Sequence, residues 1–573
     1  MKSDARNRLR SVVGKARNLI EEDIRSQLLR LGITEGELIP LDQLKHLDAL
    51  MKEKRQRIEK AIKKEELGNL SQKESFERYV RHVGFSFINR VAAFRALEVR
   101  NLLSRETIKR HKKYAGYSAR EYEISERERI NDPAEIVEIA FREACEDISE
   151  EISVLFDLSD EYSILFPTVH VLNQIYEHFG KDITDEDWLN DDVIGWIYQY
   201  YNSEARKEFK KKKRKPKPDD IPIINQFYTP DWIVKALVDN TLGRLWLESR
   251  GEMYRIGEGV KNSGKGRIKE YCDYIVPEKD EHIQNEIEPY EIKVLDPACG
   301  SGHFLVYAFD VLFRMYQEFD SSLPDERICE LIIENNLYGI DIDLRAVQLA
   351  ALSLYLKAKT LSSKTRIRKM NLVCADSRII DGEAKRNFLR KFETKPQRHL
   401  QRSFAKLFDD LTYTYHIGSL FRIREQFEDI MDQAALPSFL GDSKSNAQDD
   451  NSQTEQSTFD EMLAFLKRFE KEAMETHDMG TLLFAAEIEK STGLLSLLTQ
   501  RYDVVVMNPP YGDAPAEAKS YLKKNYPRTH YDYYAAFMEQ AISLCKKDGF
   551  VGMLTGRTYM FLKWFERVRT QLL

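Results

Sequence analysis

The pattern of apolar and polar positions divides the chain into two unlike parts. Through the first two hundred residues, apolar side chains recur at intervals of three and four, with charged residues between them. Residues 47–67 and 134–156 are long examples, and neither contains glycine or proline. This spacing predicts amphipathic helices. We therefore expect a helical N-terminal domain over residues 1–204.

From residue 221 onward, short apolar segments alternate with helical ones. The expected strands are 292–298, 336–342, 371–377, 502–508 and 550–556, and the clearest helical segments between or after them are 302–319, 344–359 and 531–547. The strands are apolar without strict alternation, which is typical of strands buried on both faces. The sequence therefore predicts an α/β fold with a doubly wound, mostly parallel sheet over residues 221–573.

Two segments interrupt this pattern. Residues 205–220 form a basic block whose two prolines end any helix. We expect it to be a solvated linker between the domains, with a phosphate-contacting patch as the alternative. An insertion of about 383–495 separates the third and fourth strands. Its centre, about 440–458, is polar and poor in apolar residues, which predicts disorder.

Composition narrows the possible functions. A chain of 573 residues is long enough for several domains, and its net charge of −7 gives no overall nucleic-acid signature. The six cysteines form no CxxC pair, which favours a reducing cytoplasm over a disulfide framework. No His, Asp, Glu and Cys set has metal-ligand spacing, so no metal is expected. No apolar run approaches the roughly 20 residues of a membrane span, and the charged start predicts no secretory signal.

Candidate ligand-binding residues follow the expected strands, where the crevice of a doubly wound sheet lies. Gly300 and Gly302 stand between the first strand and a helix, where small residues let the backbone approach a ligand. Asp341 ends the second strand and can accept hydrogen bonds from ribose hydroxyls, while Asp343 is suited to start the next helix. Asp376 ends the third strand and can accept from an exocyclic amine. The alternatives are a tight turn and ordinary helix caps. Neither GxGxxG nor GKS/T is present, so no dinucleotide or nucleoside-triphosphate motif is met.

The fourth strand ends in the sequence NPPY, residues 508–511. A proline carbonyl and the Asn508 side-chain oxygen are two acceptors that can hold both hydrogens of one –NH2 group. Tyr511 offers an aromatic face for a base taken out of its stack. Together these residues predict a cradle for an amine on a planar ring.

The motifs "DPACGSGHF", "YGIDID", "CADS", "YDVVVMNPPYG", "DYYAAFMEQA" and "DGFVGMLTGRTYMF" occur in this order. As a set they resemble S-adenosylmethionine-dependent DNA methyltransferases of the N6-adenine type. The N-terminal region, "HVGFSFINRVAAFRALEVRNLL" within it, is similar to the PglX-type methyltransferases of bacteriophage-exclusion (BREX) defence systems. The resemblance implies a Rossmann-like methyltransferase fold. It also implies a C-terminal target-recognition domain, which is absent from the 573 residues.

The resemblance also implies roles for individual residues. The cofactor, S-adenosylmethionine, would contact Asp296, Ala298, Gly300 and Gly302 with its methionine portion, Thr229 with its carboxylate, Asp341 with its ribose, and Ile342 and Asp376 with its adenine. The catalytic set would be Asn508, Pro509, Pro510 and Tyr511, with Asn508 and Pro509 binding the target amine and Tyr511 stacking on the base. No metal takes part.

The expected activity is site-specific methylation of adenine N6 in double-stranded DNA, within a phage-defence system that resembles restriction-modification. Other defence-system proteins are expected partners, and the expected location is the cytoplasm. Two alternatives remain: a methyltransferase of RNA or of protein glutamine, and a non-catalytic subunit that binds S-adenosylmethionine and DNA. Without a recognition domain, the chain is expected to bind the cofactor but to methylate DNA weakly or not at all by itself.

Overall fold

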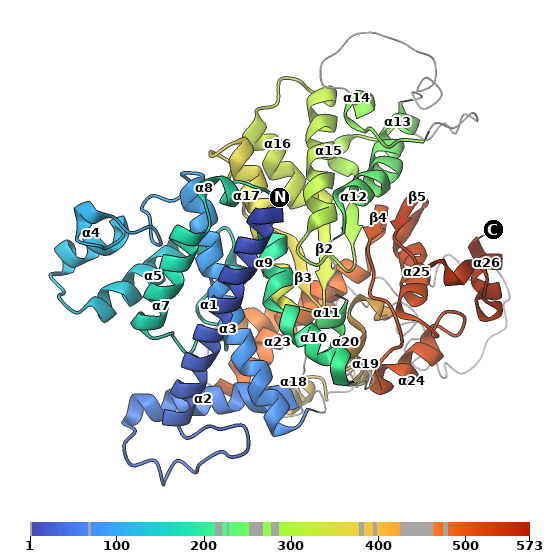
Figure 1. Ribbon diagram of the computed structural model, residues 1–573. Coiled ribbons are helices and arrows are strands. Elements are labelled where there is room, and N and C mark those ends of the chain that lie inside the picture. The colour runs from blue at the N-terminus through green and yellow to red at the C-terminus, as the bar shows by residue number, and fades with distance from the viewer. Residues whose placement is uncertain are drawn as a thin grey trace.

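The computed structural model of the protein describes residues 3–66, 70–212, 220–225, 229–250, 268–276, 286–376, 383–393, 398–423, 462–473 and 479–572. N-terminal helices gather on one side of a central sheet, and the C-terminal elements lie on its other side (Figure 1). No helix in these ranges combines the length and apolar character that crossing a membrane requires.

The sheet has five parallel strands. They are β1 (Val294–Asp296), β2 (Leu337–Asp341), β3 (Asn371–Cys374), β4 (Tyr502–Met507) and β5 (Cys545–Met553). Their spatial order is β3-β2-β1-β4-β5, so the chain winds outward from β1 in one direction and then returns to β4 on its other side. This reversal creates a crevice at the carboxyl ends of β1 and β4. The predicted doubly wound parallel sheet is confirmed.

Helices of the C-terminal part follow the strands in the chain. They are α15 (His303–Phe319), α16 (Asp325–Leu331), α17 (Leu344–Leu361), α24 (Ala516–Asn525), α25 (Tyr533–Leu544) and α26 (Glu566–Leu572). Asp343 caps α17 by accepting a hydrogen bond from the Arg345 N–H, as the sequence predicted. The helix predicted over 531–547 ends earlier, because residues from Cys545 onward pair with β4 as strand β5.

Each face of the sheet has its own hydrophobic core, because successive strand residues point to opposite sides. Val294, Leu337 and Val504 join one core, which also contains α15, α17 and the N-terminal helices. Leu295, Ile340 and Val505 join the other core. One continuous core therefore includes both the N-terminal helices and one face of the sheet.

The N-terminal part is helical throughout its main elements, as predicted. These are α1 (Ser3–Arg30), α2 (Ala49–Glu66), α3 (Gln72–Val99), α4 (Ala119–Glu128), α5 (Pro133–Ser149), α6 (Ser153–Phe156), α7 (Val169–Glu177), α8 (Asp185–Trp188), α9 (Val193–Tyr201) and α10 (Ser203–Lys212). The apolar stretch 134–156 is split, because Ile152 leaves helical geometry and turns α6 toward α17. Helix α10 carries residues 205–212 of the expected linker, and residues 213–219 lie outside the described ranges. The boundary between domains at 205–220 stays a prediction.

The described parts of the insertion cover the second face of the sheet. They include α18 (Glu383–Arg390), α19 (Arg398–Leu411), α20 (Thr414–Ile417), the short helix η8 (Gly418–Leu420) and α23 (Met479–Leu498). Their buried residues, such as Phe388, Phe404 and Leu494, form much of the second core. The insertion is therefore a structural layer of the fold. Its predicted disordered centre, 440–458, lies outside the described residues.

Candidate cofactor and substrate site

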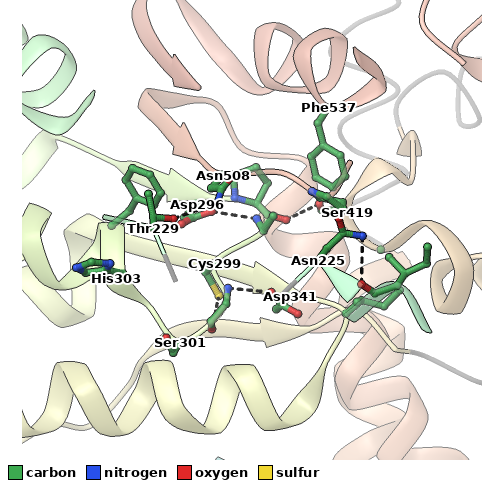
Figure 2. Close-up of a pocket in the computed structure, with 18 of the residues that line it drawn as sticks. Asn225, Thr229, Asp296, Cys299, Ser301, His303, Asp341, Ser419, Asn508 and Phe537 are labelled. Atoms are coloured by element: carbon green, nitrogen blue, oxygen red, sulfur yellow. Dashed lines mark hydrogen bonds between the residues drawn. The ribbon is translucent and has the colours of Figure 1, made fainter. Parts of the chain in front are cut away.

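A cavity of about 150 Å³ lies at the carboxyl ends of β1, β2 and β4. Among the residues that line it are Thr229, Asp296, Ala298, Gly300, Asp341, Ile342, Asn508 and Pro510, all of which the sequence had singled out. Asn508, Thr229 and Asp296 lie together in Figure 2, and Asp341 lies below them. The structure thus brings most of the predicted site residues to one cavity.

The turn after β1 is shaped by a carboxylate and two glycines. The Ala298 N–H donates to Asp296 Oδ1 at 3.0 Å, while Asp296 Oδ2 is buried and has no hydrogen-bond partner among the described residues. Gly300 and Gly302 both have positive φ, 53° and 84°. A Cβ on Gly302 would lie 3.1 Å from Ala350, so this glycine also lets α17 approach closely. Gly302 does not line the cavity and supports the turn from behind.

The two aspartates after β2 have different surroundings. Asp341 lines the cavity, and its carboxylate accepts the N–H groups of Gly300 at 2.9 Å and Asp343 at 2.8 Å. Asp343 is buried away from the cavity. The Arg345 guanidinium donates to both of its oxygens at 2.7 Å, and the Tyr198 hydroxyl donates to it at 3.0 Å. Of the two, only Asp341 is placed to contact a ligand.

The cavity is electrostatically suited to a cation. Burial raises the pKa of Asp341 to about 7 and raises the pKa of Asp296 well above its ordinary value. By contrast, the Arg345 guanidinium holds the pKa of Asp343 below its usual range despite burial. No lysine or arginine is among the described residues that line the cavity. A positively charged ligand would therefore stabilise the ionised forms of Asp296 and Asp341.

Asn508 lies at the cavity edge with both ends of its amide engaged. Its Nδ2 donates to Thr229 Oγ1 at 3.0 Å, and its Oδ1 accepts from the Tyr511 hydroxyl at 2.9 Å. A carbonyl oxygen has two lone pairs, so Oδ1 keeps the capacity to accept once more. The contact with Thr229 fixes which end of the amide is Nδ2, and Oδ1 remains able to accept one further hydrogen bond.

The other NPPY residues are placed unequally. Pro510 lines the cavity, whereas Pro509 is buried and does not. The Tyr511 hydroxyl lies 2.9 Å from both Asn508 Oδ1 and the Leu554 carbonyl, and burial raises its pKa to about 12. Its ring centroid is 6.0 Å from that of Tyr534. Tyr511 thus lies behind Asn508 in this structure and not in the cavity.

Two segments that the sequence analysis missed complete the cavity. Helix α9 contributes Gly195, Tyr198 and Gln199, and the insertion contributes the stretch His416–Ser419. The Ser419 hydroxyl donates to the Pro297 carbonyl at 2.6 Å, which ties the insertion to the turn after β1. The one local signal was the Gly-Ser pair within the otherwise apolar "HIGSLF", since Gly418 adopts a positive φ of 55°.

Asp376 does not line the cavity. Its carboxylate forms an ion pair at 3.0 Å with Arg78, which lies on the N-terminal helix α3. Its predicted contact with a cofactor adenine stays a prediction. Among the described residues, no group of three or more His, Cys, Asp or Glu side chains is arranged to hold a metal ion.

Comparisons with known families agree with this geometry. Residues 335–573 match the family described as Eco57I restriction-modification methylase, and residues 277–387 match the MmeI DNA-methyltransferase domain. The matched parts of the chain are therefore similar to methyltransferase domains of the restriction-modification type.

The relatives are more particular. The chain is 30% identical over 552 residues to the adenine-specific methyltransferase BrxX of Escherichia coli O9:H4 (strain HS), covering 89% of this chain and 43% of that protein. It is 28% identical over 534 residues to the adenine-specific methyltransferase PglX of Lacticaseibacillus casei (strain Zhang), covering 86% of this chain and 41% of that protein. The chain is thus homologous to both over most of its length, which confirms the resemblance to PglX-type methyltransferases, and it spans less than half the length of each.

Two solved structures are similar over nearly the whole chain. The DrdV–DNA complex aligns with a TM-score of 0.43 and 11% identity, covering 100% of this chain and 38% of that one. A nuclease-deletion mutant of the Type ISP restriction-modification enzyme LlaGI, in complex with a DNA substrate mimic, aligns with a TM-score of 0.40 and 12% identity, covering 98% and 30%. Scores of this size do not establish a common architecture.

Proposed function

We propose that this chain is a site-specific DNA adenine N6-methyltransferase, which binds S-adenosylmethionine in the cavity described above. The observation that carries the proposal is the position of Asn508. It directly follows β4, at the same cavity that Asp296 and Asp341 reach from β1 and β2. An amine acceptor and a set of candidate cofactor contacts therefore share one space.

The residues present fit this cofactor. When bound, S-adenosylmethionine supplies a methyl group on a positively charged sulfur. Its sulfonium and ammonium groups are cationic and suit this cavity for two reasons. Asp296 Oδ2 is buried there without a partner among the described residues, and none of the described lining residues is a lysine or an arginine. Asp341, at the end of β2, accepts from the ribose hydroxyls, and Ile342 packs against the adenine. Ala298 and Gly300 contact the methionine portion.

The chain's own part in the transfer is to hold the target amine and to match its developing charge. Asn508 Oδ1 accepts one amine hydrogen, and Thr229 keeps the amide in that orientation. The Pro509 carbonyl accepts the other only if the strand end shifts on substrate binding, because Pro509 does not line the cavity in this structure. As the amine nitrogen becomes positive, these acceptors stabilise it without having to reorganise. Positioning supplies the rest of the rate increase. Tyr511 braces Asn508 and stacks on the base only if its ring moves toward the cavity.

Double-stranded DNA is the proposed substrate, and other defence-system proteins are the proposed partners. Both named relatives are adenine-specific methyltransferases, and one matched family is a DNA-methyltransferase domain. These names favour adenine in DNA over an RNA base or a protein glutamine. Action on phage or host DNA places the protein in the bacterial cytoplasm. A second candidate is a non-catalytic subunit that binds cofactor and DNA, since the chain spans less than half of each relative.

Expression in a bacterial host that lacks adenine methylation tests the proposal. Host DNA, RNA and protein would be digested and analysed for methylated products by mass spectrometry, with Asn508→Ala expressed in parallel. Because the chain is expected to methylate DNA weakly by itself, we expect a low level of N6-methyladenine in DNA with the wild-type chain and none with the variant. Methylated RNA or glutamine would favour a methyltransferase of RNA or of protein glutamine. Cofactor binding without any methylated product would favour the non-catalytic subunit.

A further inference from the structure

Arg78, on helix α3, connects three parts of the molecule that are distant in sequence. Only 7% of this arginine is exposed. Its guanidinium donates to the Tyr415 hydroxyl at 2.7 Å, pairs with Asp376 at 3.0 Å and pairs with Glu65 at 2.7 Å. The guanidinium carbon also lies 4.9 Å from the centroid of the Tyr415 ring. One buried side chain thus joins the N-terminal helices, the segment after β3, and the insertion.

Two of these partners adjoin the cavity wall. Tyr415 directly precedes His416–Ser419, which line the cavity. Asp376 directly follows Ala375, whose N–H donates to the Asp341 carbonyl at 2.7 Å. The Ala375 side chain is also near the wall, since a Cβ built on Gly418 would lie 4.0 Å from its Cβ. Arg78 is therefore linked to the cavity wall through Tyr415 on the insertion side. On the sheet side it is linked to the wall through Asp376 and then Ala375.

We propose that Arg78 is a positioning residue of the cofactor site. It holds the Asp376 carboxylate, and through Tyr415 the His416–Ser419 wall, in the arrangement that receives the adenine end of the cofactor. This inference rests on the proposed function. It makes the N-terminal helices part of the cofactor site, because the residue that sets the adenine end comes from α3.

The chemistry of the side chain explains why arginine stands here. A guanidinium carries five donors in a planar fork and can serve several acceptors at once while stacking on an aromatic ring. Lysine keeps the charge but has a single ammonium group, so it cannot reach Glu65, Tyr415 and Asp376 together. With an uncharged amide at position 78, Asp376 would lose its ion pair with Arg78 at a site where its side chain is only 17% exposed.

The test is a comparison of two ligands by calorimetry, S-adenosylhomocysteine and S-inosylhomocysteine. The adenine amine of the first can donate to Asp376, whereas the inosine oxygen of the second cannot donate and is repelled by a carboxylate. Hydrogen bonds to charged groups are worth roughly 1.5–3 kcal/mol, so the wild-type chain should prefer the adenosyl compound by about 10- to 100-fold. Arg78→Gln should lose most of that preference, and Arg78→Lys should regain part of it.

A matched control separates positioning from mere support of the fold. Arg90 lies on the same helix and is fully buried. Within the part of the chain that the structure describes, its hydrogen bonds go only to N-terminal residues, at positions 155, 157 and 160. Arg90→Gln should lower the melting temperature and leave the ligand preference unchanged. In an Asp376→Asn background, Arg78→Gln should change the preference no further, because the two residues act through one contact.

The possible outcomes are distinct. A folded Arg78→Gln variant that keeps the wild-type preference overturns the assignment of Arg78, as does an equal loss of preference in Arg90→Gln. Circular dichroism establishes that each variant is folded, and the Arg78→Lys and Asp376→Asn chains decide the question if Arg78→Gln does not fold. A wild-type chain that binds neither compound overturns the proposed cofactor site itself. If the wild-type chain prefers the adenosyl compound but transfers no methyl group, the assignment of Arg78 stands and only the catalytic proposal is contradicted.

Discussion

Asn508 Nδ2 donates a hydrogen bond to Thr229 Oγ1 at 3.0 Å, although 279 residues separate them in the chain. The resemblance to adenine methyltransferases had assigned Thr229 to the cofactor carboxylate and Asn508 to the target amine. In the structure the two residues share one contact, so the segment before α12 (Asp231–Val238) and the end of β4 are joined. The amide of Asn508 is thereby oriented with its oxygen as the acceptor for a substrate.

Asn508→Ala should lower methyl transfer by about 100-fold or more, because removing one preorganised partner of a developing charge typically costs 10²–10³ in rate. The dissociation constant of S-adenosylmethionine should stay within about threefold, since the predicted cofactor contacts remain. Transfer of labelled methyl groups and calorimetry measure the two quantities. Loss of cofactor binding in this variant would show that Asn508 belongs to the cofactor pocket instead.

Asp341→Ala should have the opposite effect and weaken cofactor binding. Removal of a charged acceptor from two ribose hydroxyls costs on the order of 2–3 kcal/mol, or about 30- to 150-fold in the dissociation constant. A conservative comparison is Asp320→Ala, which removes a partly exposed carboxylate at the far end of α15. An unchanged dissociation constant in Asp341→Ala would contradict the ribose assignment.

Cofactor affinity should also depend on pH. Burial raises the pKa of Asp341 to about 7, so its carboxyl group takes up a proton as the pH falls through that value. The protonated form lacks the charge that attracts a cationic ligand, and the raised pKa of nearby Asp296 acts in the same direction. Affinity should therefore rise from pH 5.5 to pH 8 and then level off. Calorimetry across this range measures the rise, and Asp341→Ala should flatten it. A flat wild-type profile would show that Asp341 does not meet the cofactor.

Local patterns predicted the sheet and most of the cavity, because both depend on short segments. Apolar runs mark the five strands, and Gly300, Asp341 and Asn508 follow strand ends, which a parallel sheet brings to one edge. The missed parts depend on long-range partners. Tyr198 reaches the cavity from an N-terminal helix, and Arg78 meets Asp376 across 298 residues. Nothing in the sequence next to an arginine or a tyrosine indicates which distant carboxylate it will contact.

The two glycines of the turn after β1 should respond differently to alanine. At Gly302, positive φ and a Cβ 3.1 Å from Ala350 should together destabilise the fold by about 2–4 kcal/mol. At Gly300, where φ is 53° and a Cβ would meet open space, only the backbone strain of about 1–2 kcal/mol applies. That Cβ would occupy the cavity, so Gly300→Ala should weaken cofactor binding more than Gly302→Ala does. Thermal unfolding and calorimetry measure both effects. The reverse order in both assays would contradict this account of the turn.

Basic residues gather around α10. A groove of about 390 Å³ between α1 and α10 is lined by the cations Arg10, Lys15, Arg17 and Lys207. Arg17 pairs with Glu204, whereas Arg10, Lys15 and Lys207 form no ion pair with any described residue. The sequence favoured a solvated linker for residues 205–220, but unpaired cations on two adjacent helices fit the phosphates of a nucleic acid better.

Replacing Arg10, Lys15 and Lys207 with glutamine should therefore weaken binding to any DNA duplex and flatten its dependence on salt. Each lost phosphate contact lowers the slope of log affinity against log salt by about 0.9, so three should lower it by about 2–3. Fluorescence anisotropy with a labelled duplex at several potassium chloride concentrations gives the slope. Glutamine at Lys45, Lys52 and Lys60, which are exposed in and beside α2, removes the same charge and should leave the slope unchanged. An equal slope for the wild type and the groove variant would show that residues 205–212 do not contact phosphates and are a solvated linker. An equal fall in both triple variants would show that net charge, and not this groove, governs DNA binding.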